Sequence, residues 1–283
     1  RMIPENFKGS LISRQEKLAG IPLITYGVSM DEVVRLAREG YSILKIKIGS
    51  DPDKGNDPRK MLEWDKHRIF EIHEAIKDIP TSYTSNGKIA YYLDANGRYD
   101  NKDRLVELLD YADKIGALKS IILLEEPFAQ DNPVSVGDLP IRIAADESAH
   151  SDKDVKTRIQ MGYKAIALKP IAKTLSMSLR MVDSAAAAEV PCFCADLTVN
   201  PVMIDWNKNI AARLKPLPGM RIGVLEANGP QNYKNWETMV AYHPYSQCSW
   251  VKMKKGLFRL DNDFYEKSGG IFDISDYYLS KVW

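Results

Sequence analysis

Charged residues stand at the ends of short apolar runs along this 283-residue sequence. The runs are rich in β-branched residues, which is typical of buried strands. Charged side chains close the second to the eighth run: Lys45 and Lys47, Asp94, Glu125 and Glu126, Asp146 and Glu147, Lys169, Asp196, and Glu226. A single charge at a strand end is ordinary for a loop residue, but charges at consecutive strand ends indicate one shared site.

Carboxylates close the third, fourth and fifth runs, and no cysteine or histidine stands with them. Oxygen ligands without soft partners favour a hard cation such as Mg²⁺, with Mn²⁺ as an alternative. Several negative groups in one cleft repel each other unless a cation lies among them. The acidic strand ends therefore predict a site for a divalent metal ion.

Lysines close the second and the sixth run. A lysine near a divalent cation and a second ammonium group has a lowered pKa, so it can act as a base near neutral pH. A metal ion that binds a substrate carboxylate acidifies its α-proton and stabilises the enediolate that forms. Together these residue types predict removal of a proton from the carbon next to a carboxylate.

The elements that must position these residues alternate between strands and helices. Eight strands are expected at Ile21–Val28, Ile43–Gly49, Ile89–Ala95, Ile121–Pro127, Ile141–Glu147, Ala165–Pro170, Pro191–Asp196 and Ile222–Ala227. Helical patterns are expected at Asp31–Glu39, Asp57–Lys77, Lys102–Lys114, Asp152–Met161, Leu175–Glu189 and Val202–Leu214. This alternation predicts an α/β fold with a parallel sheet covered by helices.

Eight strand–helix units within about 200–250 residues favour a closed TIM-like (β/α)8 or (β/α)7β barrel. An open nucleotide-binding sheet is disfavoured, because no G-x-G-x-x-G follows the first strand and no Walker loop is present. A barrel gathers the carboxyl ends of its strands at one mouth, with strands two and six across from each other. Glu126 and Glu147 are expected to point away from the neighbouring acids and to orient a lysine or a ligand.

The bulk composition is that of a globular protein with little net charge. A formal net charge of +1 gives no attraction to nucleic acid or to an anionic membrane. No membrane span or signal peptide is expected, and three cysteines predict reduced thiols in a cytoplasmic protein, with Cys192 and Cys194 inside a strand. The histidines are expected on helix faces or loops, mostly at the surface: His67, His73, His150 and His243.

The order K-x-K, D-A-N, E-E-P, D-E-S and K-P resembles the enolase superfamily, in its mandelate-racemase-like and muconate-lactonizing branches. The resemblance covers the expected barrel, 21–227. It implies that Asp94, Glu125 and Asp146 hold Mg²⁺. It further implies that Lys47 and Lys169 are bases on the two faces of the substrate.

The resemblance implies supporting roles for other residues. Lys45 is similar to a helper lysine that holds the substrate carboxylate, and Glu226 matches an acid that approaches it. Asn96 and Glu147 are expected to support the metal ligands from behind. Asp196 and Asn228 are expected to contact a polar substrate.

Two departures from the superfamily pattern narrow the assignment. The seventh strand has no histidine, which favours the branch of cycloisomerases, succinylbenzoate synthases and epimerases that use two lysines. Glu226-Ala227-Asn228 stands where dipeptide epimerases carry Asp-x-Asp, so a standard dipeptide substrate is in doubt.

The resemblance also predicts a domain arrangement. Members carry an α+β capping domain before the barrel, and this domain is expected to be missing here. Residues 1–20 are expected to be the remnant of the connection to it, and 228–283 a tail outside the barrel.

The expected activity is racemisation or epimerisation of an amino acid or an N-acyl or dipeptide-like acid. An acid-sugar dehydratase or a cycloisomerase of the same superfamily is the alternative within the fold. A non-catalytic barrel with a structural network of ion pairs is the alternative from another class. The expected partner is a small carboxylate substrate, and formation of a homo-oligomer is left open.

Overall fold

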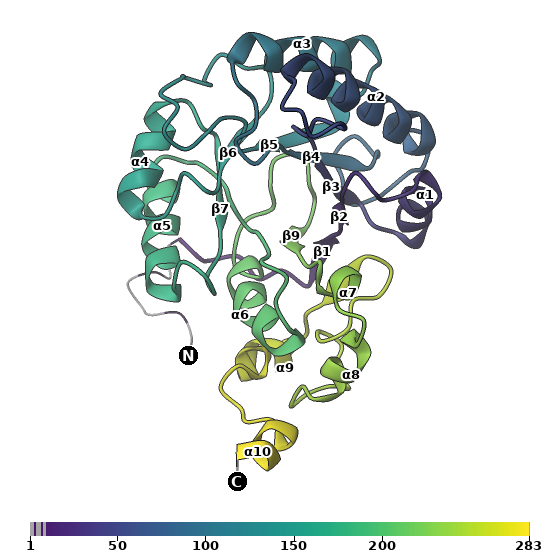
Figure 1. Ribbon diagram of the computed structural model, residues 1–283. Coiled ribbons are helices and arrows are strands. Elements are labelled where there is room, and N and C mark those ends of the chain that lie inside the picture. The colour runs from purple at the N-terminus through teal and green to yellow at the C-terminus, as the bar shows by residue number, and fades with distance from the viewer. Residues whose placement is uncertain (1–2, 4–6, 8–9, 283) are drawn as a thin grey trace.

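The computed structural model describes residues 3, 7 and 10–282 (Figure 1). Ten strands form one sheet in the order β10-β1-β9-β8-β7-β6-β5-β4-β3-β2. Their bounds are β1 Lys17–Ile21, β2 Leu23–Ile24, β3 Ile43–Lys47, β4 Ala90–Asp94, β5 Ile121–Glu125, β6 Ile143–Ala145, β7 Ala165–Leu168, β8 Cys192–Cys194, β9 Gly223–Glu226 and β10 Leu257–Arg259. All pairs are parallel except that of β10 with β1.

The sheet closes into a barrel through β1 and β2, which only Pro22 separates. On one side Ile21 of β1 stands opposite Glu226 of β9, and on the other Leu23 of β2 stands opposite Lys45 of β3. The side-chain amide of Gln231 donates to the Leu23 carbonyl and accepts from the Leu23 N–H, at 3.0 and 2.8 Å. The first and last parallel strands are thus joined, and the predicted TIM-like barrel is confirmed.

The expected first strand, Ile21–Val28, was placed too late. Two strands, β1 and β2, lie between Lys17 and Ile24, and the chain turns after them, where the Val28 N–H donates to the Thr25 carbonyl. Most of β1 therefore lies within the expected connecting segment 1–20. Residues 1–2, 4–6 and 8–9 of that segment lie outside the described residues.

Helices follow most of the strands and surround the barrel in Figure 1. They are α1 Met30–Glu39, α2 Pro58–Ile76, α3 Lys102–Lys114, α4 Asp152–Gln160, α5 Leu175–Ala187 and α6 Pro201–Ala211. Each begins after a Ser, Thr, Asp or Asn whose side chain accepts a hydrogen bond from a first-turn N–H. Such caps satisfy N–H groups that a helix start leaves without partners.

Two apolar clusters show which strand positions face inward. One joins the strands to the helices and includes Leu93 and Ala145, whereas the other fills the barrel and includes Tyr92 and Ala144. Side chains alternate along a strand, so Asp94 shares the inner face with Tyr92. By the same rule Asp146, Lys169 and Glu226 continue the inner positions of their strands at the mouth.

The C-terminal segment forms short elements beside α6 (Figure 1). They are α7 Gly229–Asn232, α8 Trp236–Ala241, α9 Asn262–Lys267, the 3-10 turn Ser268–Gly270 and α10 Asp276–Val282. His243 is buried here, and its Nε2 bonds Asp205 at 2.8 Å. His73 is also buried and bonds the Tyr91 hydroxyl, so the surface prediction was wrong for these two histidines. Cys192 and Cys194 are buried in β8, as predicted.

Candidate metal and proton-transfer site

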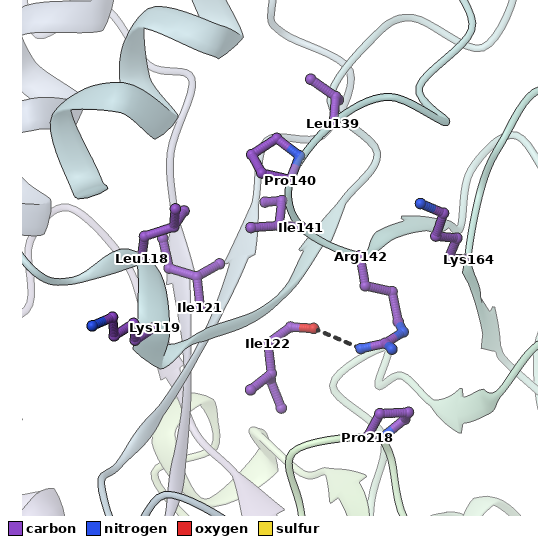
Figure 2. Close-up of a pocket in the computed structure, with 10 residues that line it drawn as sticks. All are labelled: Leu118, Lys119, Ile121, Ile122, Leu139, Pro140, Ile141, Arg142, Lys164 and Pro218. Carbon is purple, nitrogen blue, oxygen red and sulfur yellow. Dashed lines mark hydrogen bonds between the residues drawn. The ribbon is translucent and has the colours of Figure 1, made fainter. Parts of the chain in front are cut away.

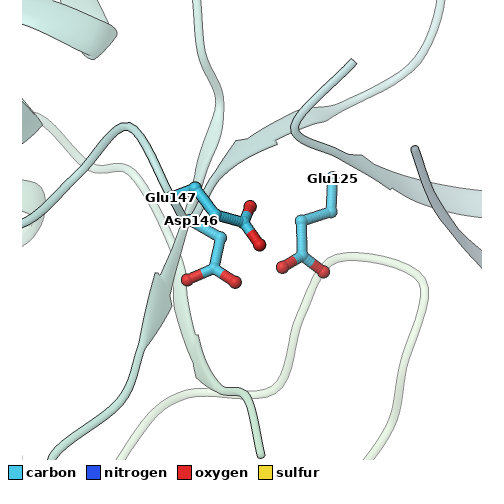
Figure 3. A group of neighbouring side chains, drawn as sticks. All are labelled: Glu125, Asp146 and Glu147. Atoms are coloured by element: carbon cyan, nitrogen blue, oxygen red, sulfur yellow. The ribbon is translucent and has the colours of Figure 1, made fainter. Parts of the chain in front are cut away.

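Three carboxylates converge at the mouth of the barrel (Figure 3). Glu125 ends β5, whereas Asp146 and Glu147 follow β6, and one oxygen atom of each lies within 4.8 Å of the others. Buried oxygens without any hydrogen-bond donor include Glu125 Oε1 and Glu147 Oε2. Unsatisfied buried oxygens are costly, and a hard cation would satisfy them, so this group can hold a metal ion.

This group differs from the predicted ligand set in one member. Glu147 was expected to point away from the metal, but β6 ends at Ala145, so strand alternation no longer fixes the direction of Glu147. Its carboxylate also accepts a hydrogen bond from Asn96 Nδ2 at 3.1 Å. Asp94 is not in the group of three, and it reaches Glu125 through a shared contact with Lys45.

Lys45 lies at the centre of the buried acids. Its Nζ is 2.9 Å from Asp94 and Glu125 and 3.1 Å from Glu226. Burial alone would lower the pKa of Lys45, but the three carboxylates outweigh burial and hold that pKa well above its usual range. Lys45 is thus a fixed positive charge that neutralises the acids.

Burial and Lys45 act in opposite directions on the surrounding acids. Burial raises the pKa of Glu125 well above its usual value, against the effect of Lys45, and nearby Asp146 raises it further. Burial would also raise the pKa of Asp94, but Lys45 and Lys47 outweigh it and lower that pKa. The hydroxyl of Tyr92 donates to Glu125.

The two predicted bases lie on opposite sides of this centre. Lys47 ends β3 and Lys169 follows β7, four strands away in the closed barrel, in which β1 and β2 together act as one strand beside β3 to β9. Lys47 Nζ contacts Asp94 at 2.6 Å and Asn96 Oδ1 at 2.5 Å, and Lys169 contacts Asp146. Their side chains are 20% and 14% exposed, against 5% for Lys45, so these two lysines can meet a substrate.

The protonation of Lys169 depends on its acidic neighbours. Burial lowers the pKa of Lys169, but Asp146 and Glu125 outweigh burial and raise that pKa. The lowered pKa that the sequence predicts for this lysine requires the positive charge of a cation beside it. Asp146 shows the reverse effect: hydrogen bonding from Glu125 and the charges of Lys169 and Lys173 lower its pKa despite burial.

Lys173 is a member of the site that the sequence argument missed. Its Nζ donates to the carbonyls of Asp146 and Ala149 at 2.7 and 2.8 Å, and lies 3.2 Å from Asp146 Oδ1. It lies four positions after Lys169 in KPIAK, and this spacing is the one signal that could have found it. Lys173 fixes the backbone of the turn that carries Asp146.

Glu126 holds the same turn from the other side. Its Oε2 accepts from the N–H of Asp146 at 2.7 Å, and from the N–H and hydroxyl of Ser148 at 3.2 and 3.0 Å. This is the orienting role expected of the second glutamate in E-E-P. Three donors on one oxygen fix the turn in space.

The residues that follow β8 and β9 are hydrogen-bonded to each other and do not line an open cleft. Asp196 Oδ2 accepts from Asn228 N–H at 2.8 Å, and Oδ1 accepts from Leu197 N–H at 2.7 Å. Asn228 Oδ1 accepts from the Thr198 hydroxyl at 2.8 Å. Asp196 therefore fixes two loops, and this geometry does not favour the substrate contact predicted for it. Glu226 is buried against Lys45.

A separate hollow of about 530 Å³ lies at the opposite end of the barrel (Figure 2). Ile121 and Ile122 at its wall begin β5, and Arg142 precedes β6, so the hollow is at the amino ends of these strands. Arg142 donates to the Ile122 carbonyl at 3.4 Å. This hollow is not part of the site at the mouth.

No helix among the described residues is long and apolar enough to cross a membrane. The fold and site define a (β/α) barrel with acids and lysines at the carboxyl ends of its strands. The chain belongs to the enolase C-terminal domain-like family, whose sequence model matches residues 29–215. The predicted membership of the enolase superfamily is confirmed.

Solved structures share this fold. A mandelate racemase/muconate lactonizing protein from Herpetosiphon aurantiacus aligns with 89% of this chain at 18% identity and a TM-score of 0.65. A muconate lactonizing enzyme from Klebsiella pneumoniae aligns with 88% at 17% identity and a TM-score of 0.62. A dipeptide epimerase from Cytophaga hutchinsonii, complexed with Mg and the dipeptide D-Ala-L-Val, aligns with 80% at 19% identity and a TM-score of 0.60.

The alignments cover 65%, 61% and 56% of those three chains, respectively, so this chain spans less than two thirds of their length. Identities below one in five show the shared fold alone. A search among curated proteins found no match to this chain.

Proposed function

We propose that this barrel removes the proton next to a substrate carboxylate with the help of Mg²⁺ or Mn²⁺, as a racemase or epimerase. The observation that carries the proposal is the placement of Lys47 and Lys169 on opposite sides of the buried carboxylates. Inversion at a carbon needs one group to take a proton from one face and another to return one to the opposite face. The substrate class is an amino acid or an N-acyl or dipeptide-like acid.

The chain's own residues supply the metal ligands. Glu125 and Asp146 belong both to the predicted ligand set and to the group of three carboxylates in the structure. Asp94 and Glu147 are the two candidates for the third ligand. When bound, Mg²⁺ supplies positive charge that stabilises the substrate carboxylate as its α-proton leaves. Hard oxygen donors and the orphaned oxygens of Glu125 and Glu147 fit such an ion.

The charge balance of the mouth supports a lysine base. Five carboxylates and four lysines meet there: Asp94, Glu125, Asp146, Glu147 and Glu226 with Lys45, Lys47, Lys169 and Lys173. Burial raises the pKa of Glu125 and Glu226, so a divalent cation bound here would take the place of protons on the acids, and its positive charge would lower the pKa of the nearby lysines. The neutral lysine is the form that accepts a proton.

The remaining side chains set the proton-transfer geometry. Asn96 and Asp94 hold the ammonium group of Lys47, and Asp146 holds that of Lys169. Lys45 lowers the pKa of the three carboxylates around it, against the effect of their burial, rather than meeting the substrate alone. Glu126 and Lys173 fix the turn that carries Asp146.

A non-catalytic barrel is the second candidate, because Lys45 and three buried carboxylates already form a closed network of ion pairs. Proton exchange distinguishes the two. The protein is incubated with Mg²⁺ in D₂O with a panel of N-acyl amino acids and dipeptides, and deuterium at the α-carbon is followed by NMR. A racemase exchanges the proton without loss of water, whereas a dehydratase releases water.

Two variants make the assay specific. Lys47→Met and Lys169→Met each remove one base, so each should abolish exchange from one enantiomer and retain some exchange from the other. Lys66→Met, on α2 away from the mouth and paired with the exposed Glu63 and Glu107, is the matched control and should exchange like the parent. Exchange that both base variants retain in full would refute the assignment of Lys47 and Lys169.

A further inference from the structure

One buried carboxylate outside the metal group accepts hydrogen bonds from three mouth loops. Asp65 of α2 is fully buried. Its Oδ2 accepts from the Gly49 N–H and from the Tyr99 hydroxyl, both at 2.8 Å. Its Oδ1 lies 3.4 Å from the Tyr26 hydroxyl, which itself accepts from Ser50 N–H at 2.8 Å.

These donors come from three consecutive strand-to-helix loops. Tyr26 follows β2, Gly49 follows Lys47 by two residues, and Tyr99 follows Asp94 by five. The loops are also in close contact, since Gly49 has a φ of 84° and a Cβ there would lie 2.9 Å from the Cβ of Arg98. A shift of any one loop would therefore break bonds to Asp65 and disturb its neighbours.

The charged and titratable groups around Asp65 come from each of these elements. Arg68, on the same helix, donates to the Thr25 carbonyl and lies with its guanidinium 5.6 Å from the Tyr26 ring. The charge of Arg98, in the β4–α3 loop, lowers the pKa of Tyr26, and the charge of Arg104, on α3, lowers the pKa of Tyr99, although burial raises both. Burial raises the pKa of Asp65 to about 7, although the Gly49 N–H, the two hydroxyls and Arg68 all lower it.

We propose that Asp65 is a positioning residue that ties the loops after β2, β3 and β4 into one arrangement and thereby sets Lys47 and Asp94. The role in catalysis rests on the proposed function, but the tie itself does not. Lys47 and Asp94 stand directly before two of the tied loops. Loosening these loops would move the proposed base relative to the carboxylates.

Hydrogen–deuterium exchange of the full chain, read by mass spectrometry, tests the tie without metal or substrate. Asp65→Asn should speed exchange in 48–57 and 95–101 about tenfold, which corresponds to about 1.4 kcal/mol of lost hydrogen bonding to the loops. Tyr99→Phe removes one donor only, so it should give a smaller increase in the same segments. Tyr91→Phe is the matched control, because the Tyr91 hydroxyl also bonds α2, through His73 at 3.0 Å.

The response to pH separates positioning from general stability. In the closed arrangement the pKa of Asp65 is about 7, whereas a solvated Asp has a pKa of about 3.9. Between about pH 5 and about 7, Asp65 is largely protonated in the closed arrangement and ionised in the open one. Opening therefore releases a proton, so a rise in pH over this range favours opening. Loop exchange in the parent, corrected for its intrinsic pH dependence, should rise over this range, and Asp65→Asn should abolish the rise.

Three results would overturn the proposal: unchanged loop exchange in both variants, equal acceleration in β7 and β8, or a pH response that persists in Asp65→Asn. A Mg²⁺ titration of the same samples keeps the two proposals distinguishable. Absence of Mg²⁺ binding in the parent would count against the proposed function, whereas the exchange result would still decide the tie. Tyr99→Phe carries the test if Asp65→Asn does not fold.

Discussion

Replacing Lys45 by methionine removes the ammonium group that three buried carboxylates share. Methionine has a similar length, so the volume is retained while Asp94, Glu125 and Glu226 lose their common positive charge. Removing one partner of a buried ion pair costs about 3–5 kcal/mol, because the other charge stays buried without compensation. We expect Lys45→Met to lower the free energy of unfolding by about that amount at neutral pH.

The loss should shrink at low pH. Lys45 helps to hold the pKa of Asp94 below its unfolded value, and the resulting stability is present above the unfolded pKa and lost as pH falls through the folded pKa. Parent and variant should therefore converge as the pH falls below the unfolded pKa of about 3.9 and then through the lower folded pKa of Asp94.

Urea unfolding at several pH values, in metal-free buffer, measures this difference. Lys66→Met is the control, because Lys66 also contacts two glutamates, Glu63 and Glu107, but at the surface, where such pairs contribute less than about 1 kcal/mol. An equal and small loss in both variants would refute the reasoning, since the buried acids would then not need Lys45.

Two further predictions concern groups away from the proposed metal site. The pKa of Asp65 is raised to about 7, so the free energy of unfolding should fall by on the order of 4 kcal/mol as the pH rises from about 4 to about 7. Asp65→Asn should flatten this part of a profile of thermal unfolding against pH. A steeper profile in the variant would contradict the predicted direction of the pH effect. Lys208→Met should cost about 3–5 kcal/mol in urea unfolding, because buried Asp205 loses its ammonium partner and the Trp250 carbonyl loses its donor. A loss below about 1 kcal/mol for Lys208→Met would show that His243 alone satisfies Asp205.

The barrel could be predicted because strand alternation and apolar periodicity are local properties. Asp94 follows Tyr92 on the inner face, and Glu226 likewise follows Val224, so their direction can be read from spacing alone. The pairing of Lys47 and Lys169 across the mouth follows from strand order, which the fold class fixes.

The remaining features depend on where regular structure ends. Glu147 turns toward Glu125 because β6 stops at Ala145, and a strand end is set by tertiary contacts. Lys173 reaches Asp146 through a loop whose path has no periodic signal. Asp196 accepts hydrogen bonds from backbone N–H groups of two loops, and only the closed barrel brings these loops together.

The histidines show a related difficulty. His243 is buried because the C-terminal segment packs on α6, where Asp205 meets it. No local pattern in the sequence indicates this long-range pair. The same holds for Gln231, whose amide completes the pairing of β2.

The central claim is that the acids at the mouth form a divalent metal site. Calorimetric titration of Mg²⁺ into metal-free protein tests it, with the double variant Glu125→Gln, Asp146→Asn and with Asp53→Asn as an exposed acidic control. Single variants Asp94→Asn and Glu147→Gln then identify the third ligand as the one whose loss weakens binding more. The account predicts saturable binding in the parent and the control and none in the double variant. Equal binding in all three, or no binding in the parent, would contradict it.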